Sequence, residues 1–229
     1  MFRFIYNQIK NNLKKIKFVR LLLYKIKSGY KKYQVFNFLK KDSVFIDLGA
    51  NIGNVSTYIN DKFGCKIYCY EPHPSAYNYL KKKLGKYKNI TTINCAVSNQ
   101  TSEQDIYLHK DSSKQNDLFY SQATSLEKNK ENISLEKKIK TKCIHISEIL
   151  KKFNYIDCIK IDIEGHEYKI LPFLIEKKNM IKKVICELHG NSTYDSGDIK
   201  NAFLKPEYDK TIEILKEKNL YKNWFLEWE

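Results

Sequence analysis

A turn with two glycines follows an acidic residue early in the chain, within the run FIDLGANIG at residues 45–53. Asp47 precedes this turn, and Gly49 and Gly53 stand on either side of Asn51. Glycine lets a backbone approach a ligand closely and adopt dihedral angles that other residues avoid. If a helix begins after the turn, its free N–H groups and partial positive charge suit a carboxylate or a phosphate. These residues are therefore candidates for a cofactor-binding turn.

A second acidic residue, Glu71, lies 22 residues after Gly49 and is followed by Pro72. An acid about 20 residues beyond a glycine turn, at the tip of the next strand, is placed to accept hydrogen bonds from ribose hydroxyls. Asn51 stands where a dinucleotide-binding turn has its second glycine, which disfavours a pyrophosphate and hence a nicotinamide-dependent reductase. An adenosyl ligand with its own carboxylate fits better, and S-adenosylmethionine is such a ligand.

Four further polar residues form two pairs with the same spacing, Asp162 with Glu164 and Glu187 with His189. Residues i and i+2 of a strand point to one face, and ligands bind at the carboxyl edge of open α/β sheets. If the two strands are neighbours, these side chains converge there. One interpretation is general-base catalysis, for which histidine has a suitable pKa range. A second is a Mg²⁺ or Mn²⁺ site. A third is structural, with Glu164 capping a helix and His189 in a surface turn.

Short apolar runs alternate with helical stretches and would place these candidates at strand ends. Strands are predicted over residues 43–48, 66–70, 89–97, 157–163, 183–188 and 221–228, and helices over 53–63, 75–87, 167–177 and 208–218. Near-continuous apolar strands that alternate with helices indicate a mostly parallel sheet with helices on both faces. The expected fold class is therefore α/β and Rossmann-like, in one domain over residues 42–229.

A less regular stretch interrupts this alternation. Strands are predicted at 103–109 and 138–144, and the residues between them are polar and have no apolar period. A long polar insertion in a compact domain is usually functional or disordered. We expect residues 109–137 to form a mobile loop on the substrate side.

The net charge of +15 is unevenly distributed. Residues 1–41 hold twelve Lys or Arg and no acid, so the body carries only +3. This segment also repeats apolar residues at helical spacing, which predicts a basic amphipathic helical extension. It could pack on the domain, or it could contact an anionic lipid surface or another polyanion. A nearly neutral body argues against a specific nucleic-acid partner.

The chain has no run of 18 uncharged apolar residues and no uninterrupted apolar signal region, so no transmembrane helix or cleaved signal peptide is expected. The six cysteines contain no CxxC pair and lie mostly in apolar runs, which is typical of buried free thiols. These features favour a cytoplasmic protein, with peripheral membrane contact through residues 1–41 as an open alternative.

Five segments occur in an order that resembles the FkbM family of S-adenosylmethionine-dependent methyltransferases. They are FIDLGANIG, YEPHPSAYNYL, INCAVSN, DCIKIDIEGHEYKIL and VICELHG, and they span roughly residues 42–190. The resemblance implies a class I methyltransferase fold and O-methylation, often of sugars. It also implies that Asp47, Gly49, Asn51 and Glu71 hold the cofactor, that Cys95 and Ala96 line the adenine edge, and that Asp162 lies near the transferred methyl group.

The expected function is therefore transfer of a methyl group to a hydroxyl of a sugar or glycan precursor, with a small molecule or a glycan as the acceptor. Two alternatives remain at this point. One is a nucleic-acid methyltransferase, which the net charge suggests. The other is a non-catalytic binding module that docks on a membrane or polyanion through its basic extension. Whether the chain forms a homodimer stays open.

Overall fold

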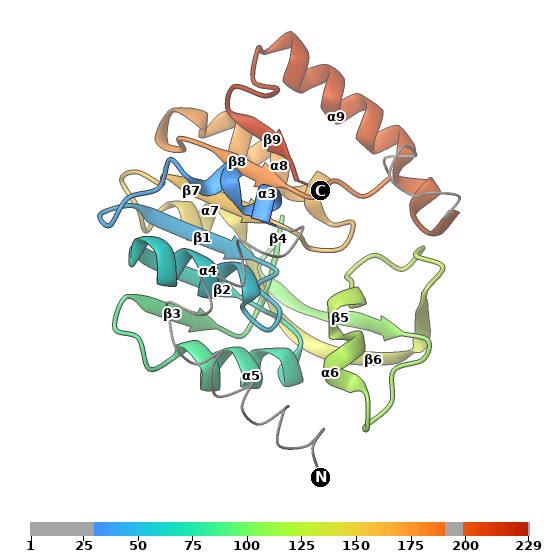
Figure 1. The fold of residues 1–229 in the computed structure, drawn as a ribbon. Coiled ribbons are helices and arrows are strands. Elements are labelled where there is room, and N and C mark those ends of the chain that lie inside the picture. Colours follow the sequence, from blue (N-terminus) through green and yellow to red (C-terminus); the bar gives the residue numbers. More distant parts are fainter. Residues whose placement is uncertain (1–29, 191–198, 229) are drawn as a thin grey trace.

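The computed structural model describes residues 30–190 and 199–228. Its centre is a sheet of six strands in which every pairing is parallel, in the order β3-β2-β1-β7-β8-β9 (Figure 1). The strands are β1 (Val44–Leu48), β2 (Lys66–Tyr70), β3 (Ile90–Ile93), β7 (Cys158–Ile161), β8 (Val184–Cys186) and β9 (Phe225–Glu227). The order reverses between β1 and β7, so a crevice for ligands is expected there. The predicted α/β, Rossmann-like fold is confirmed.

Helices cover both faces of this sheet, as the alternation predicts. They include α4 (Asn54–Phe63), α5 (Pro74–Leu84), α7 (Ile146–Leu150), α8 (Glu167–Glu176) and α9 (Lys205–Glu217). Successive strand residues point to opposite faces, so Phe45 packs with α4 and α5, whereas Ile46 packs with α7, α8 and α9. Two apolar clusters therefore fix the sheet between the helix layers.

A second, three-stranded sheet lies beside the carboxyl edge of the first (Figure 1). Its order is β4-β6-β5, with β4 (Ala96–Ser98), β5 (Ser102–His109) and β6 (Ile133–His145). The prediction of one strand over 89–97 was therefore wrong. The chain leaves the main sheet at Asn94, whose side-chain amide donates to the backbone oxygens of Glu71 and Pro72 at 2.8 and 3.1 Å.

The polar stretch before β6 is shorter than predicted, because β6 starts five residues earlier than expected. It contains helix α6 (Asp117–Tyr120) and a 3₁₀ turn at Ser121–Ala123. The closing strand is also shorter than predicted, because only Phe225–Glu227 pairs with β8. All six cysteines are buried free thiols.

Most of the predicted basic extension lies outside the described residues. The described part begins with helix α3 (Tyr30–Tyr33) and a 3₁₀ turn at Gln34–Phe36. Phe36 is fully buried and makes edge-to-face contacts with Phe45 and Trp228, so this end of the segment belongs to the core. Among the helices that the structure describes, none is long and apolar enough to cross a membrane.

Candidate functional site

A cavity of about 260 Å³ opens at the carboxyl ends of the central strands, between the two sheets. Nine of the twelve residues predicted from the sequence line it: Gly49, Asn51, Glu71, Pro72, Cys95, Ala96, Asp162, Glu164 and Glu187. The other three, Asp47, Gly53 and His189, do not line it. The tertiary structure therefore brings both predicted groups of residues to one site.

The glycine turn approaches the end of β7 very closely. Gly49 has φ of +75°, and a Cβ atom there would lie 1.8 Å from the backbone oxygen of Asp162. Asn51 also has a positive φ, 48°, and its side-chain amide donates to Ser121 Oγ at 3.0 Å. Only glycine fits at position 49, because any side chain would collide with the neighbouring strand. The turn is thus shaped by contact with β7 as well as by its own sequence.

Glu71 lies at the tip of β2 with its carboxylate buried beside the turn. Its oxygens accept hydrogen bonds from the backbone N–H of Asn51, at 2.7 Å, and of His73, at 2.8 Å. Burial raises the pKa of Glu71 to about 7, although both hydrogen bonds oppose this shift. The two N–H donors hold the carboxylate in one orientation at the cavity wall, which fits the predicted contact with ribose hydroxyls.

Asp47 and Gly53 support the turn from inside the protein. Asp47 is fully buried, accepts a hydrogen bond from Ser56 Oγ at 2.6 Å and lies 3.3 Å from Lys160 Nζ. A Cβ atom at Gly53 would lie 2.5 Å from the side chain of Leu80. The contacts of Asp47 are with protein groups, so its predicted role in holding the cofactor remains a prediction.

Lys160 is a functional candidate that the sequence analysis did not single out. It is 2% exposed, and its Nζ atom lies 3.3 Å from Asp47 Oδ1, 3.3 Å from Asp162 Oδ2 and 3.0 Å from the backbone oxygen of Gly49. Burial lowers the pKa of Lys160, but Asp162 and Asp47 more than compensate and hold it above its usual value. One buried ammonium group thus connects the turn to the end of β7. The signal in the sequence was a charged residue inside the apolar run DCIKIDI.

His189 lies between two carboxylates. Its Nδ1 atom is 3.0 Å from Glu167 Oε1, and its Nε2 atom is 3.5 Å from Glu164 Oε2. Burial lowers the pKa of His189, but the two carboxylates outweigh burial and raise it well above the usual value. An imidazolium cannot accept a proton, so this geometry does not favour the general-base interpretation of His189. Glu167, fully buried, is a second residue that the sequence analysis did not name.

Three of the four proposed metal ligands lie close together, because ligand atoms of Asp162, Glu164 and His189 are all within 4.8 Å of one another. Glu187 is not in this group. However, Lys130 Nζ already pairs with Glu164, and the pKa of Glu164 is lowered to about 2 against the effect of burial. A divalent cation would have to displace that ammonium group and the His189 proton. The donor set therefore fits Mg²⁺ or Mn²⁺ poorly.

The polar stretch forms one wall of the cavity, because Ser121, Gln122 and Thr124–Leu126 line it. Three contacts tie this wall to the segment after β7. Ser125 Oγ donates to the backbone oxygen of Glu164 at 2.6 Å, Glu127 lies 2.6 Å from His166 Nδ1, and Lys130 pairs with the Glu164 carboxylate. The wall thus lies beside the cavity, and its contact with substrate and its mobility remain predictions.

Lys130→Met should loosen this wall without unfolding the domain. Lys130 is 4% exposed, and its loss leaves the Glu164 carboxylate with His189 as its cationic partner among the described residues. We expect amide hydrogen exchange over residues 121–130 to become at least about tenfold faster, because a local opening loses one partly buried ion pair. The control is Lys128→Met, which removes an exposed lysine two residues away. Equal exchange in both variants would contradict a tethering role.

Comparison with known proteins places the chain in a family. The family model of the methyltransferase FkbM domain matches residues 47–222. No curated protein matches the chain.

Three solved structures are similar at low identity. A precorrin-6y C5,15-methyltransferase from Geobacter metallireducens has 13% identity and a TM-score of 0.44, over 82% of this chain and 68% of that one. An rRNA methylase from Streptococcus thermophilus has 11% identity and a TM-score of 0.41, over 83% and 80%. The plantazolicin methyltransferase BamL, in complex with a triazolic desmethylPZN analogue and SAH, has 13% identity and a TM-score of 0.39, over 93% and 68%.

The family match covers most of the chain and contains the glycine turn, Glu71 and the acidic residues after β7 and β8. The all-parallel sheet, with its cavity at the carboxyl edge, is a Rossmann-like arrangement. On the strength of the family match, the protein is a methyltransferase. The chain belongs to the FkbM methyltransferase family.

Proposed function

We propose that the protein transfers a methyl group from S-adenosylmethionine to a hydroxyl of a sugar or glycan precursor. The observation that supports this proposal is that two chemically different groups of residues line one cavity. The first group is the Gly49 turn, Glu71 and the apolar run Cys95–Val97, and the second group is the carboxylates of Asp162 and Glu187.

The first group of residues fits a nucleoside that carries an amino acid. The fixed carboxylate of Glu71 can accept two hydrogen bonds from ribose hydroxyls, and Cys95–Val97 with Ile106 offer apolar contacts to an adenine ring. Gly49 lines the cavity next to Asp162, because its lack of a side chain lets the turn pack directly against the end of β7. When bound there, S-adenosylmethionine supplies a methyl group already activated by a sulfonium.

The second group of residues fits a neutral polyhydroxyl acceptor. The carboxylates of Asp162 and Glu187 can accept hydrogen bonds from neighbouring hydroxyls and so orient one of them for reaction. Burial and the nearby Asp162 raise the pKa of Glu187, which makes its ionised form a stronger base. We assign Glu187 as the group that takes up the proton of the acceptor hydroxyl and Asp162 as the group that positions that hydroxyl.

The same carboxylates argue against a nucleic-acid acceptor, because their negative charges would repel the negatively charged phosphodiester groups of such an acceptor. A binding module without catalysis would not need a carboxylate of raised pKa in the cavity. One assay of methyl transfer distinguishes these alternatives from the proposal: a nucleic-acid methyltransferase would label an RNA acceptor, and a binding module would label no acceptor.

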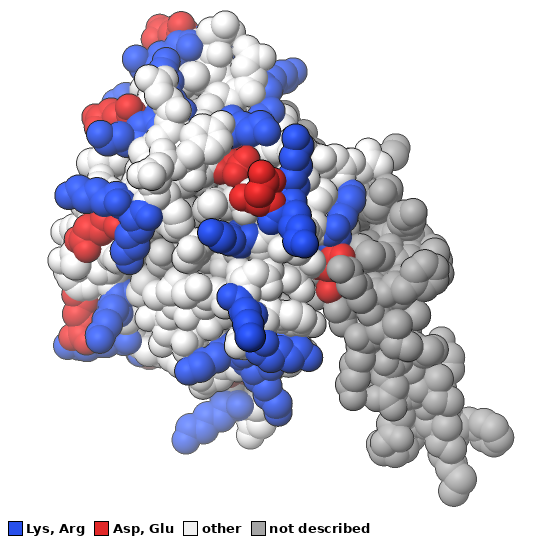
Figure 2. All heavy atoms as spheres, turned by 90° about the vertical axis from the view of Figure 1, so that its left-hand side faces the viewer, with Lys and Arg blue, Asp and Glu red and all other residues white. Residues whose placement is uncertain are grey.

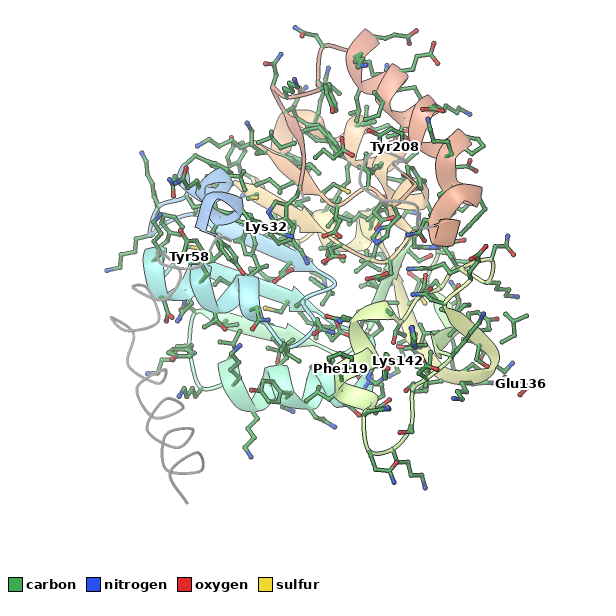
Figure 3. All side chains as sticks on the ribbon, turned by 45° about the vertical axis from the view of Figure 1, so that its right-hand side comes forward. Lys32, Tyr58, Phe119, Glu136, Lys142 and Tyr208 are labelled. Carbon is green, nitrogen blue, oxygen red and sulfur yellow. The ribbon has the colours of Figure 1, made fainter. Side chains whose placement is uncertain are left out.

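Glu187→Gln should lower kcat by about 10²-fold or more, because general-base catalysis contributes about 10²–10⁴. The KM for S-adenosylmethionine should stay unchanged. The measurement is transfer of labelled methyl from S-adenosylmethionine to a panel of neutral sugars, nucleotide sugars and tRNA. Glu136→Gln is the matched control, since Glu136 is exposed and lies at the outer end of β6, far from the cavity (Figure 3).

Label in tRNA but not in any sugar would contradict the acceptor class. Calorimetric titration with S-adenosylhomocysteine tests the cofactor independently of any acceptor. No binding in that titration would contradict the cofactor assignment and support the binding module. An equal loss of activity in Glu136→Gln would contradict the role of Glu187.

A further inference from the structure

The net positive charge of this protein comes from the first part of its sequence. Residues 1–102 hold nineteen Lys or Arg and four Asp or Glu, so they carry the whole net charge of +15. Residues 43–102 are all described, and their three acids, Asp47, Asp61 and Glu71, are buried at 0, 2 and 4% exposure. The segment that forms β1–β3, α4 and α5 therefore presents no exposed carboxylate, and Asp42, two residues before β1, is the exposed acid next to it.

Six exposed lysines belong to this half and lie near the amino ends of its strands. They come from the end of α4, the start of β2, the end of α5 and the turn before β3. We call them the basic face: Lys62, Lys66, Lys81, Lys82, Lys86 and Lys88. Figure 2 looks onto this edge of the sheet, and its lower part, where α5 lies, shows lysines that project outward and almost no acidic side chain.

The cavity lies at the opposite edge of the same sheet, since Gly49, Glu71 and Asp162 follow the carboxyl ends of β1, β2 and β7. The acidic groups of the site and the lysines of the basic face are thus separated along the strand direction. A partner bound to the basic face would leave the cavity open. The positive charge of the basic face therefore does not contact a ligand in the cavity.

The composition of this face suits a lipid surface better than a nucleic acid. The described residues contain no arginine, because the two arginines of the chain are Arg3 and Arg20. Arginine forms bidentate hydrogen bonds with bases and phosphates, which makes it the preferred side chain for nucleic-acid recognition. Lysine acts as a point charge, and a diffuse anionic surface attracts it without specific geometry. Two tyrosines lie among the lysines, Tyr79 at 45% exposure and Tyr87 between Lys86 and Lys88. Such rings favour the level of lipid headgroups.

We propose that the basic face docks the protein on an anionic lipid bilayer with the cavity directed away from the membrane plane. The face acts through the summed attraction of its lysines to lipid phosphates. Docking here needs no residue of the cavity, so it is independent of the acceptor proposed above.

The test is cosedimentation of the full chain with vesicles of phosphatidylcholine, with and without phosphatidylglycerol. The face variant replaces Lys81, Lys82, Lys86 and Lys88 with Gln. The matched control replaces four exposed lysines of α9 and the following turn, Lys210, Lys216, Lys218 and Lys222, with Gln. Both variants lose the same charge and keep residues 1–41. Thermal unfolding checks that both remain folded.

We expect the unchanged protein to bind the anionic vesicles and not the neutral ones. The face variant should bind at least about tenfold more weakly, because each lysine near the surface contributes to attraction, and the control should change less than about threefold. Equal binding of the two variants would overturn the proposal, since net charge or residues 1–41 would then account for attachment. Binding of poly(U) but not of vesicles, lost only in the face variant, would overturn it in favour of a nucleic acid.

Discussion

Lys160→Met is expected to lower the free energy of unfolding by about 3–5 kcal/mol, which is the usual cost of leaving a buried charge without its partner. The charge left behind is that of Asp47, which is fully buried and whose other contact is the Ser56 hydroxyl. In a domain of this size the melting temperature should fall by about 10 °C. The measurement is thermal or urea unfolding, with Lys182→Met, an exposed lysine, as the control.

A double variant separates the structural role of Lys160 from its role in the site. Adding Asp47→Asn to Lys160→Met removes the unpaired buried charge and should restore most of the lost stability. Activity should not return, because the Gly49 carbonyl and the Asp162 carboxylate still lack their shared donor. A small misplacement of such groups can cost about 10²-fold, so kcat/KM should stay about 10²-fold low. Recovery of both stability and kcat/KM would show that Lys160 is structural only.

The affinity for S-adenosylhomocysteine is expected to rise with pH and to level off above the pKa of Glu71, about 7 in the unliganded protein. Only the ionised carboxylate can accept hydrogen bonds from both ribose hydroxyls with its two oxygens. Binding therefore favours the ionised form and releases a proton wherever Glu71 is protonated beforehand. Below the pKa, affinity should rise about tenfold per pH unit. Calorimetry in buffers of different ionisation enthalpy would also detect the released proton.

Glu71→Gln is the decisive comparison, because it keeps the shape of the side chain and removes its titration. Its affinity should be weaker by about 10–100-fold at high pH, since a hydrogen bond to a charged group is worth about 1.5–3 kcal/mol. Its affinity should also be independent of pH in the range where the unchanged protein varies. A flat pH profile in the unchanged protein would contradict the ionisation of Glu71 as the controlling event.

Much of the proposed cofactor site could be predicted from the sequence, because the sequence signals for its residues are local. The turn from Gly49 to Gly53 directly follows a buried strand, and Glu71 directly follows the next one. In a parallel sheet, successive strand tips meet at one edge, so sequence order alone predicts that these residues converge. The strand over 89–97 was mispredicted because that prediction also used only the local apolar pattern. Its apolar pattern continues past Asn94, but the hydrogen bonds of Asn94 to the backbone after β2 turn the chain into another sheet.

The α/β class, the helix layers and the carboxylates at the strand ends can all be predicted from residue order, because periodicity and strand order encode them. The ion pairs among those carboxylates, in contrast, follow from the folded arrangement of the strands. Lys160 became the link between Asp47 and Asp162 because β1 and β7, more than a hundred residues apart, are neighbours in the sheet. The pKa of His189 is raised because the fold places its ring between the carboxylates of Glu164 and Glu167. Such pairings depend on contacts between distant segments, and no local spacing records them.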